Sequence, residues 1–288
     1  MKSVVVCYFS GTGNTELVAN MIKEEFSQLQ YTVDLVRMED VLNHHLNIDL
    51  GKYDFIGIGS QVIGYGAPKI VYDFIRALPK GNGKKVFVFR TAGGVAPINY
   101  NASKWMLRKL TKKGYDAFHE RLFSIGSNWV VRFDSDVMRQ LYDATKKKVG
   151  IMCREIILGE KRILRTDWGL KMRMELVELF FTRALRWMAK DYSVKKTCTH
   201  CGQCIKNCPS RNIIEKNKKI KFGFNCNGCM RCYYICPKNA INFRIYKFFP
   251  VAGGYNAKKI FTQSGSEIEK IPGFTPPFLD NYLKNDSL

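Results

Sequence analysis

The stretch Val4-Val5-Val6-Cys7-Tyr8-Phe9-Ser10-Gly11-Thr12-Gly13-Asn14-Thr15 joins an apolar run to a short turn of glycines and hydroxyl residues. The run Val4–Phe9 does not alternate between polar and apolar residues, which predicts a strand buried on both faces. The residues after the turn, Thr15–Gln28, predict a helix. A buried strand, a glycine turn and a helix in this order are typical of a parallel α/β sheet.

The same alternation of apolar runs and helical patterns continues along the first part of the chain. Further strands are predicted at Thr32–Val36, Phe55–Gly59, Val86–Arg90 and within Ala117–Ile125. Helices are predicted at Lys69–Ala77, directly after a proline that suits a helix start, and at Ser103–Lys113. The pattern therefore predicts an α/β domain built on a parallel sheet.

The turn Ser10–Thr15 has the composition of a phosphate-binding loop. Glycines let the backbone fold around a phosphate, and hydroxyl groups and helix N-terminal amides can hydrogen-bond its oxygens. The glycine spacing is not that of the dinucleotide fingerprint, and no Gly-Lys-Ser/Thr follows as in a P-loop. A phosphate site of another kind is expected here.

This turn resembles the flavodoxin phosphate loop, S/T-x-T-G-x-T, and the similarity extends over residues 1–160. The resemblance implies a doubly wound five-stranded parallel sheet that binds flavin mononucleotide (FMN) at the carboxyl ends of its strands. Two later loops fall where that fold requires them, and Tyr65 could stack on the flavin ring. The predicted FMN-binding residues are Ser10, Gly11, Thr12, Gly13, Asn14, Thr15, Ser60, Gln61, Val62, Ile63, Gly64, Tyr65, Gly66, Thr91, Ala92, Gly93 and Gly94.

Eight of the ten cysteines lie between Cys198 and Cys236, in two runs of the form C-x2-C-x2-C-x3-C-P. Two matched runs with trailing prolines favour two [4Fe–4S] clusters over zinc, which takes only four ligands. In this arrangement the fourth cysteine of each run ligates the other cluster. The expected ligands are Cys198, Cys201, Cys204 and Cys236 for the first cluster, and Cys226, Cys229, Cys232 and Cys208 for the second.

This part of the chain resembles a bacterial two-[4Fe–4S] ferredoxin. The predicted organisation is a flavodoxin-like domain at 1–160, a helical bridge at 161–194, a small α+β ferredoxin-like domain at 195–246 and a C-terminal extension at 247–288. Within the bridge, Gly169–Lys190 carries apolar residues at helical spacing. We interpret it as a helix between the domains, with an interfacial membrane or partner-docking helix as the alternative.

The formal net charge of +21 is high even after bound clusters and flavin phosphate are allowed for. Such a field attracts acidic redox proteins, anionic membrane surfaces or nucleic acid. The basic residues are dispersed and no nucleic-acid motif is present, so an acidic ferredoxin or flavodoxin is the expected partner. No apolar run is long enough for a membrane span or a signal peptide, which predicts a cytoplasmic location. The sequence does not predict the oligomeric state.

The chain as a whole resembles flavodoxin–ferredoxin fusion proteins of anaerobic bacteria and archaea. The resemblance implies an electron-transfer iron–sulfur flavoprotein that converts between one-electron and two-electron steps. An FMN-dependent oxidoreductase with a small-molecule substrate is the alternative, and a nucleic-acid-binding redox sensor is a minor one. No carboxylate or histidine pair stands out, so no catalytic acid or base is assigned.

Overall fold

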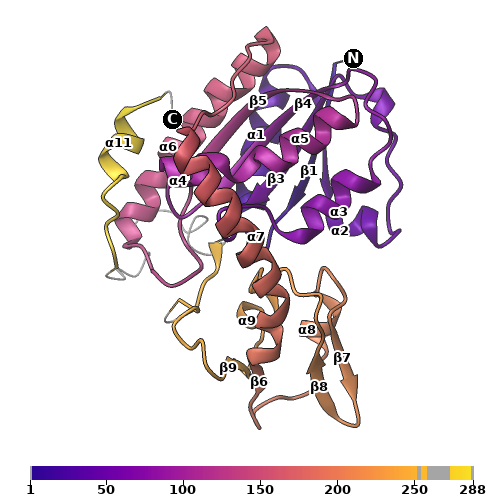
Figure 1. Cartoon of the computed structure of the whole chain (residues 1–288), viewed down its shortest axis with the longest axis vertical. Coiled ribbons are helices and arrows are strands. Elements are labelled where there is room, and N and C mark those ends of the chain that lie inside the picture. The colour runs from indigo at the N-terminus through magenta and orange to yellow at the C-terminus, as the bar shows by residue number, and fades with distance from the viewer. Residues whose placement is uncertain (1, 252–253, 258–272, 287–288) are drawn as a thin grey trace.

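The computed structural model describes residues 2–251, 254–257 and 273–286, and it consists of a larger α/β part and a smaller part below it (Figure 1). The larger part is built on a five-stranded parallel sheet of order β2-β1-β3-β4-β5. Its strands are β1 (Ser3–Phe9), β2 (Thr32–Arg37), β3 (Phe55–Gln61), β4 (Lys85–Ala92) and β5 (Asp116–Ser124).

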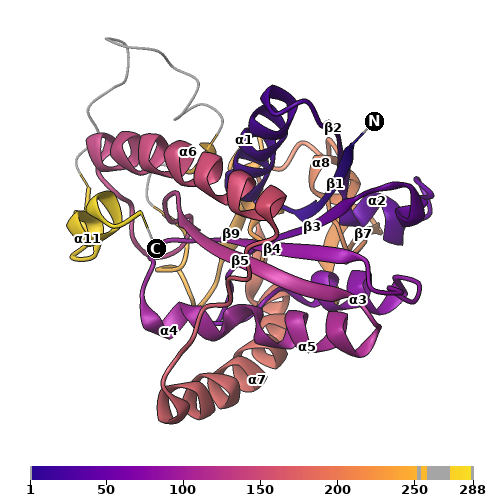
Figure 2. The same ribbon diagram turned by 90° about the horizontal axis from the view of Figure 1, so that it is seen from above.

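Helices cover both faces of this sheet, as a doubly wound fold requires (Figure 2). Helices α1 (Asn14–Gln28) and α6 (Ser135–Leu158) enclose one apolar core, and α3 (Lys69–Ala77) and α5 (Lys104–Lys112) enclose the other. The predicted fold class is confirmed, and the predicted strands and helices lie within one or two residues of those observed. The shorter elements are α2 (Met38–Leu42), α4 (Pro97–Tyr100) and the 3₁₀ turns Leu50–Lys52 and Asn101–Ser103.

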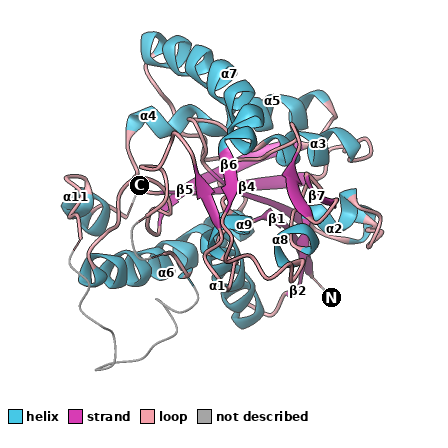
Figure 3. Ribbon diagram, turned by 90° about the horizontal axis from the view of Figure 1, so that it is seen from below, coloured by secondary structure: helices cyan, strands magenta, loops and turns pink. Residues whose placement is uncertain are grey.

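Helix α7 (Trp168–Asp191) runs from the α5 side of the sheet down to the smaller part (Figure 1). There two antiparallel pairs form, β6 (Tyr192–Val194) with β9 (Ile241–Phe243) and β7 (Ile213–Lys216) with β8 (Lys219–Phe222), together with the short helices α8 (Gln203–Lys206) and α9 (Arg231–Tyr234) (Figure 3). No helix in the described ranges has both the length and the apolar composition needed to cross a bilayer.

The described part of the C-terminal extension returns to the larger part and ends in helix α11 (Leu279–Lys284) beside α6. Tyr282 is fully buried there, and its hydroxyl accepts a hydrogen bond of 3.2 Å from the backbone amide of Ser124. The same hydroxyl lies 3.0 Å from Thr145 Oγ1. This end of the chain is therefore a packed element of the α/β core.

Candidate functional site

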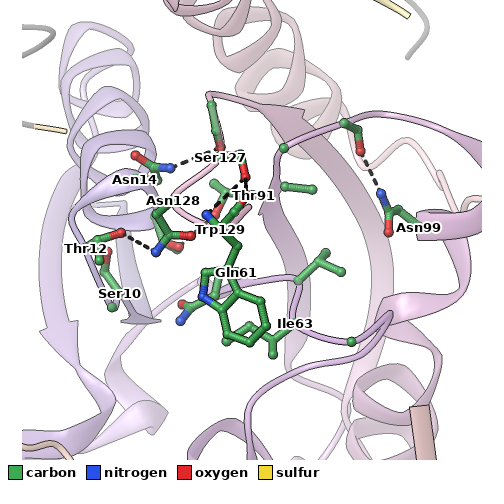
Figure 4. A pocket seen from close by; sticks show the side chains of 18 of the residues that line it. Ser10, Thr12, Asn14, Gln61, Ile63, Thr91, Asn99, Ser127, Asn128 and Trp129 are labelled. Atoms are coloured by element: carbon green, nitrogen blue, oxygen red, sulfur yellow. Dashed lines mark hydrogen bonds between the residues drawn. The ribbon is translucent and has the colours of Figure 1, made fainter. Parts of the chain in front are cut away.

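A cavity of about 370 Å³ opens at the carboxyl ends of the parallel strands, where a doubly wound sheet binds its ligands. Its volume lies in the range of small-molecule and cofactor sites. The loops after β1, β3 and β4 line it, and Figure 4 shows their side chains around the cavity. The structure brings these predicted FMN residues together: Ser10, Gly11, Thr12, Asn14, Thr15, Gln61, Val62, Ile63, Gly64, Tyr65, Thr91, Ala92, Gly93 and Gly94.

Three predicted residues stand behind this lining. Gly13 precedes α1 with a positive φ of 104° and donates its amide to Ser10 Oγ at 3.2 Å. Ser60 is fully buried within β3. Gly66 closes the loop after β3 through reciprocal backbone hydrogen bonds with Ile63. None of the three is among the residues that line the cavity.

The end of the cavity beside α1 suits a phosphate group. No side chain caps the N-terminus of α1, so its first amides remain available to an anion. Hydroxyl groups gather at the same place, with Ser10 and Thr15 buried and Thr15 Oγ1 lying 2.8 Å from Thr91 Oγ1. Hydroxyl and amide donors at a helix N-terminus are the groups that a phosphate dianion requires.

The loops after β3 and β4 offer groups for a flat polar ring. The side-chain oxygen of Gln61 is buried and has no hydrogen-bond partner among the described residues, so a ligand N–H would satisfy it. The backbone amide of Val62 donates to Thr91 O at 2.8 Å, which holds the loops after β3 and β4 together. A Cβ atom at Gly93 would lie 3.0 Å from Ser127 Cβ. At this position the wall of the cavity is therefore formed by backbone without a side chain. The residues present therefore fit FMN.

Six lining residues were not predicted: Asn99, Gly126, Ser127, Asn128, Trp129 and Phe181. The indole ring of Trp129 points across the cavity toward Ile63 (Figure 4), and its centroid lies 6.3 Å from that of Phe181. The loop 126–129 follows β5 in the way the other loops follow β1, β3 and β4, so its position was a usable signal. Phe181 belongs to α7, and no sequence pattern placed that helix against the flavin loops.

The eight clustered cysteines gather in two groups around two small cavities. Cys198, Cys201, Cys204 and Cys236 line one cavity, and the other is lined by Cys208, Cys226, Cys229 and Cys232. Each group combines three cysteines of one run with the last cysteine of the other. No group of three or more His, Cys, Asp or Glu side chains in the described ranges is arranged to hold a single metal ion.

The second cysteine group is the more deeply buried one. Burial, aided by the charge of Cys229, raises the pKa of the Cys226 thiol to about 12. Burial likewise raises the pKa of Cys232 well above that of a free thiol, with neighbouring cysteines adding to the shift. Thiolates so placed need nearby positive charge, which metal ligation supplies. The donor set and its surroundings therefore suit an iron–sulfur cluster.

The second cysteine group lies directly against the phosphate loop. A Cβ atom on Gly11 would overlap the carbonyl oxygen of Cys229 and lie 3.0 Å from its Cβ. Two polar contacts hold the same interface: Ile70 N donates to Asn227 Oδ1 at 3.0 Å, and Arg231 Nη2 donates to Ser10 O at 2.6 Å. The loop that suits the FMN phosphate and a cysteine of the second group are thus in van der Waals contact.

Replacing Gly11 with alanine tests this contact. The added methyl group would push against backbone atoms of Cys229, and overpacking of this kind costs about 1–3 kcal/mol. We expect weaker docking of the two parts, measured as a lower urea midpoint and slower cluster-mediated flavin reduction, with FMN still bound. Gly51→Ala is the control, because its methyl group would meet only the side chain of Asp49. Equal effects of both variants would contradict the close approach.

Glu178 is a buried carboxyl group beside the loop after β3. It is 3% exposed, its Oε1 accepts a hydrogen bond from Tyr72 Oη at 2.6 Å, and its Oε2 has no partner among the described residues. Tyr72 Oη in turn accepts from the amide of Ala67 at 3.3 Å. Burial raises the pKa of Glu178 from 4.5 to about 7, against the lowering effect of the Tyr72 hydrogen bond.

This shift predicts a pH-dependent contribution to stability. Because the folded-state pKa lies above the unfolded value, the contribution is complete below about pH 4.5 and is lost as the pH rises through about 7. Between about pH 5 and about pH 8 the free energy of unfolding should fall by ~2.5 kcal/mol through this group. Glu178→Gln keeps an acceptor for Tyr72 and removes that fall. Urea midpoints of both proteins at the two pH values measure the difference, and parallel curves would contradict the assignment.

Comparison with known proteins agrees with this two-part organisation. A flavodoxin domain model matches residues 5–124, and a 4Fe-4S dicluster domain model matches residues 190–237. A flavodoxin from Megasphaera elsdenii is 34% identical over 107 residues, which cover 36% of this chain and 70% of that protein. Ketoisovalerate oxidoreductase subunit VorC from Methanothermobacter marburgensis is 38% identical over 69 residues, 20% of this chain and 87% of the relative.

Two other matches differ widely in the shares of the chains that they cover. The putative electron transport protein YccM from Escherichia coli is 38% identical over 71 residues, and the chain spans only 18% of its length. The solved structure of a flavodoxin from the domain Archaea aligns with 55% of this chain and 99% of its own, at 16% identity and a TM-score of 0.37. With both domain matches in chain order, the protein belongs to the flavodoxin–ferredoxin fusion family, in which a flavodoxin domain precedes a 4Fe-4S dicluster domain.

Proposed function

We propose that this protein transfers electrons between two [4Fe–4S] clusters and one FMN within a single chain. The contact between Gly11 and Cys229 carries the proposal, because it sets a residue of the FMN phosphate loop against a proposed cluster ligand. The clusters would supply one-electron chemistry, and FMN accepts one or two electrons.

The chain's own residues would hold these groups as follows. Ser10, Thr15 and the first amides of α1 would bind the FMN phosphate, and Gln61 would accept a hydrogen bond from the ring. Cys198, Cys201, Cys204 and Cys236 would ligate the first cluster, and Cys208, Cys226, Cys229 and Cys232 the second. The buried second group lies beside the flavin loop, whereas Cys201 of the first group is exposed.

The first cysteine group, with its exposed Cys201, is the side at which we expect a partner protein. Residues 195–246 contain eleven Lys and Arg residues and a single acidic residue, Glu215. Lys195, Lys196, Lys206 and Lys238 are exposed close in sequence to the cysteines of the first group. A basic surface around an exposed cluster ligand suits an acidic redox protein, whose association it would accelerate.

The test is a stoichiometry and redox measurement on anaerobically prepared full-length protein. About eight irons and one FMN per chain are expected, together with flavin reduction by a reduced ferredoxin. Zinc in place of iron, or no bound FMN after reconstitution, would contradict the proposal. Ferredoxin-driven reduction that slows steeply with added salt would support the basic docking side.

The wall formed by Trp129 and Phe181 favours a second candidate function. Aromatic side chains beside a flavin cavity of this size can hold a small organic substrate against the ring. In that case the protein is an FMN-dependent oxidoreductase that is supplied with electrons by its own clusters. Rapid reoxidation of the reduced protein by a small molecule, slowed at least tenfold in Trp129→Ala, would select this function. Reoxidation by protein partners alone would select the carrier.

A further inference from the structure

Helix α7 exposes a row of large apolar side chains to solvent. Six of them are between 46% and 72% exposed, which is unusual for residues of this size: Trp168, Met172, Leu176, Leu179, Phe180 and Trp187. At 3.6 residues per turn they fall on one side of the helix. The opposite side, with Leu185, Met188 and Ala189, packs into the core of the smaller part.

The charged side chains of α7 are also distributed unevenly between its exposed and packed sides. Its exposed basic residues are Arg173, Arg183, Arg186 and Lys190. Its acidic residues are all engaged elsewhere: Glu178 with Tyr72, Glu175 with Lys104 at 3.5 Å, and Asp191 with the amides of Ile245 and Tyr246, both at 2.9 Å. The exposed face of α7 therefore combines apolar and positively charged side chains and presents no carboxylate.

The apolar row continues past the C-terminal end of α7. The rings of Trp187 and Phe224 meet with centroids 4.8 Å apart, and Lys190 Nζ lies 4.0 Å above the ring of the half-exposed Phe224. Trp168 and Trp187 mark the two ends of the helix, separated by about 28 Å at 1.5 Å per residue. In Figure 2 the helix lies at the edge of the molecule, on the side of the sheet away from α1 and α6.

We propose that the exposed face of α7 docks onto an anionic lipid surface, with the helix lying flat in the interface. Tryptophan, leucine and phenylalanine interspersed with arginine are the side chains that such interfacial helices use, and the arginines match the sign of anionic headgroups. A second copy of the chain is a poorer occupant, because pairing two of these faces would bring eight cations together with no carboxylate to compensate. The inference does not depend on the proposed electron transfer.

The test is co-sedimentation of the full-length, cofactor-loaded protein with vesicles. Vesicles of phosphatidylcholine alone are compared with vesicles of phosphatidylcholine mixed equally with phosphatidylglycerol. We expect binding to the anionic vesicles only, a blue shift of tryptophan emission on binding, and release by added salt. Arg183→Gln with Arg186→Gln should weaken partitioning about 30-fold, because each basic residue near an anionic surface contributes ~1 kcal/mol.

The control removes the same charge from the opposite side of the sheet. Lys23 on α1 and Lys146 on α6 are exposed there, and Lys23→Gln with Lys146→Gln should change partitioning by less than about threefold. Phe180→Ser with Trp187→Ser tests the apolar row, with Leu158→Ser as its control. Absence of binding to anionic vesicles, equal losses in the α7 and control variants, or a dimer dissolved by the α7 variants would each overturn the proposal. FMN and iron contents report whether each variant has folded.

Discussion

With Cys229 replaced by alanine, reduced ferredoxin should still bleach one iron–sulfur cluster while the flavin absorbance stays oxidised. With Cys201 replaced by alanine, the same donor should reduce neither the remaining cluster nor the flavin. The difference follows from where the two cysteines lie. Cys229 is 8% exposed and touches Gly11 of the phosphate loop, whereas Cys201 is exposed. Loss of one ligand removes or destabilises the cluster that it holds, so each variant should interrupt the transfer at a different place.

The measurement is a stopped-flow experiment that follows cluster and flavin absorbance separately, with dithionite as a small donor that can reach either part. Cys153→Ala is the matched control, because this thiol is fully buried in the α/β core and lies far along the chain from the cysteine runs. It should transfer electrons at close to the wild-type rate. If Cys201→Ala were reduced by ferredoxin as fast as the wild type, the first cysteine group would not be the side at which the donor acts.

The core of the fold was predictable because its signals are local. Runs such as Val4–Phe9 are apolar throughout because both faces of the sheet are covered, and their short length and β-branched residues distinguish them from a buried helix. The short helix Met38–Leu42 was not predicted, since five residues are too few to show a helical period. No helix was predicted within the C-terminal extension, whose described part holds α11 against Ser124 and Thr145. Residues 252–253, 258–272 and 287–288 of the predicted extension lie outside the described residues.

The residues of the candidate site were likewise predictable only in part. The phosphate loop and the loops after β3 and β4 were predictable because parallel strands bring their carboxyl ends to one edge of the sheet. The loop 126–129 follows β5 and could have been placed by the same rule, but the contact of the Trp129 ring with Phe181 could not, because it depends on how α7 packs against that edge. Arg231 stands between two cysteines that are expected to ligate iron. The sequence of that run does not indicate that the Arg231 side chain contacts the first domain. Long-range packing, which sequence periodicity does not encode, decides both contacts.

The second prediction with a large expected effect therefore concerns Arg231. Its side chain is only 15% exposed, and its guanidinium group donates to Glu39 Oε1 at 2.6 Å, to Ser10 O at 2.6 Å and to Asn207 O at 3.2 Å. The side chain of Glu39 is 7% exposed, so Arg231→Gln leaves its carboxylate buried without its cation, and breaking a buried pair costs about 3–5 kcal/mol. We expect a loss near 3 kcal/mol, because the arginine is partly exposed, together with slow reduction of the flavin by ferredoxin.

A double variant separates the effect of the Arg231–Glu39 ion pair on stability from the effect of the contact between the domains on flavin reduction. Glu39→Gln combined with Arg231→Gln removes the stranded charge, so most of the lost stability should return, which urea unfolding measures. Flavin reduction should stay slow in this double variant, because the hydrogen bond to Ser10 O is still missing. Arg244→Gln, an exposed position in the same domain, controls for the change in charge. If the double variant recovered its reduction rate along with its stability, Arg231 would act only by neutralising Glu39, and its bond to the phosphate loop would have no part in coupling the two domains.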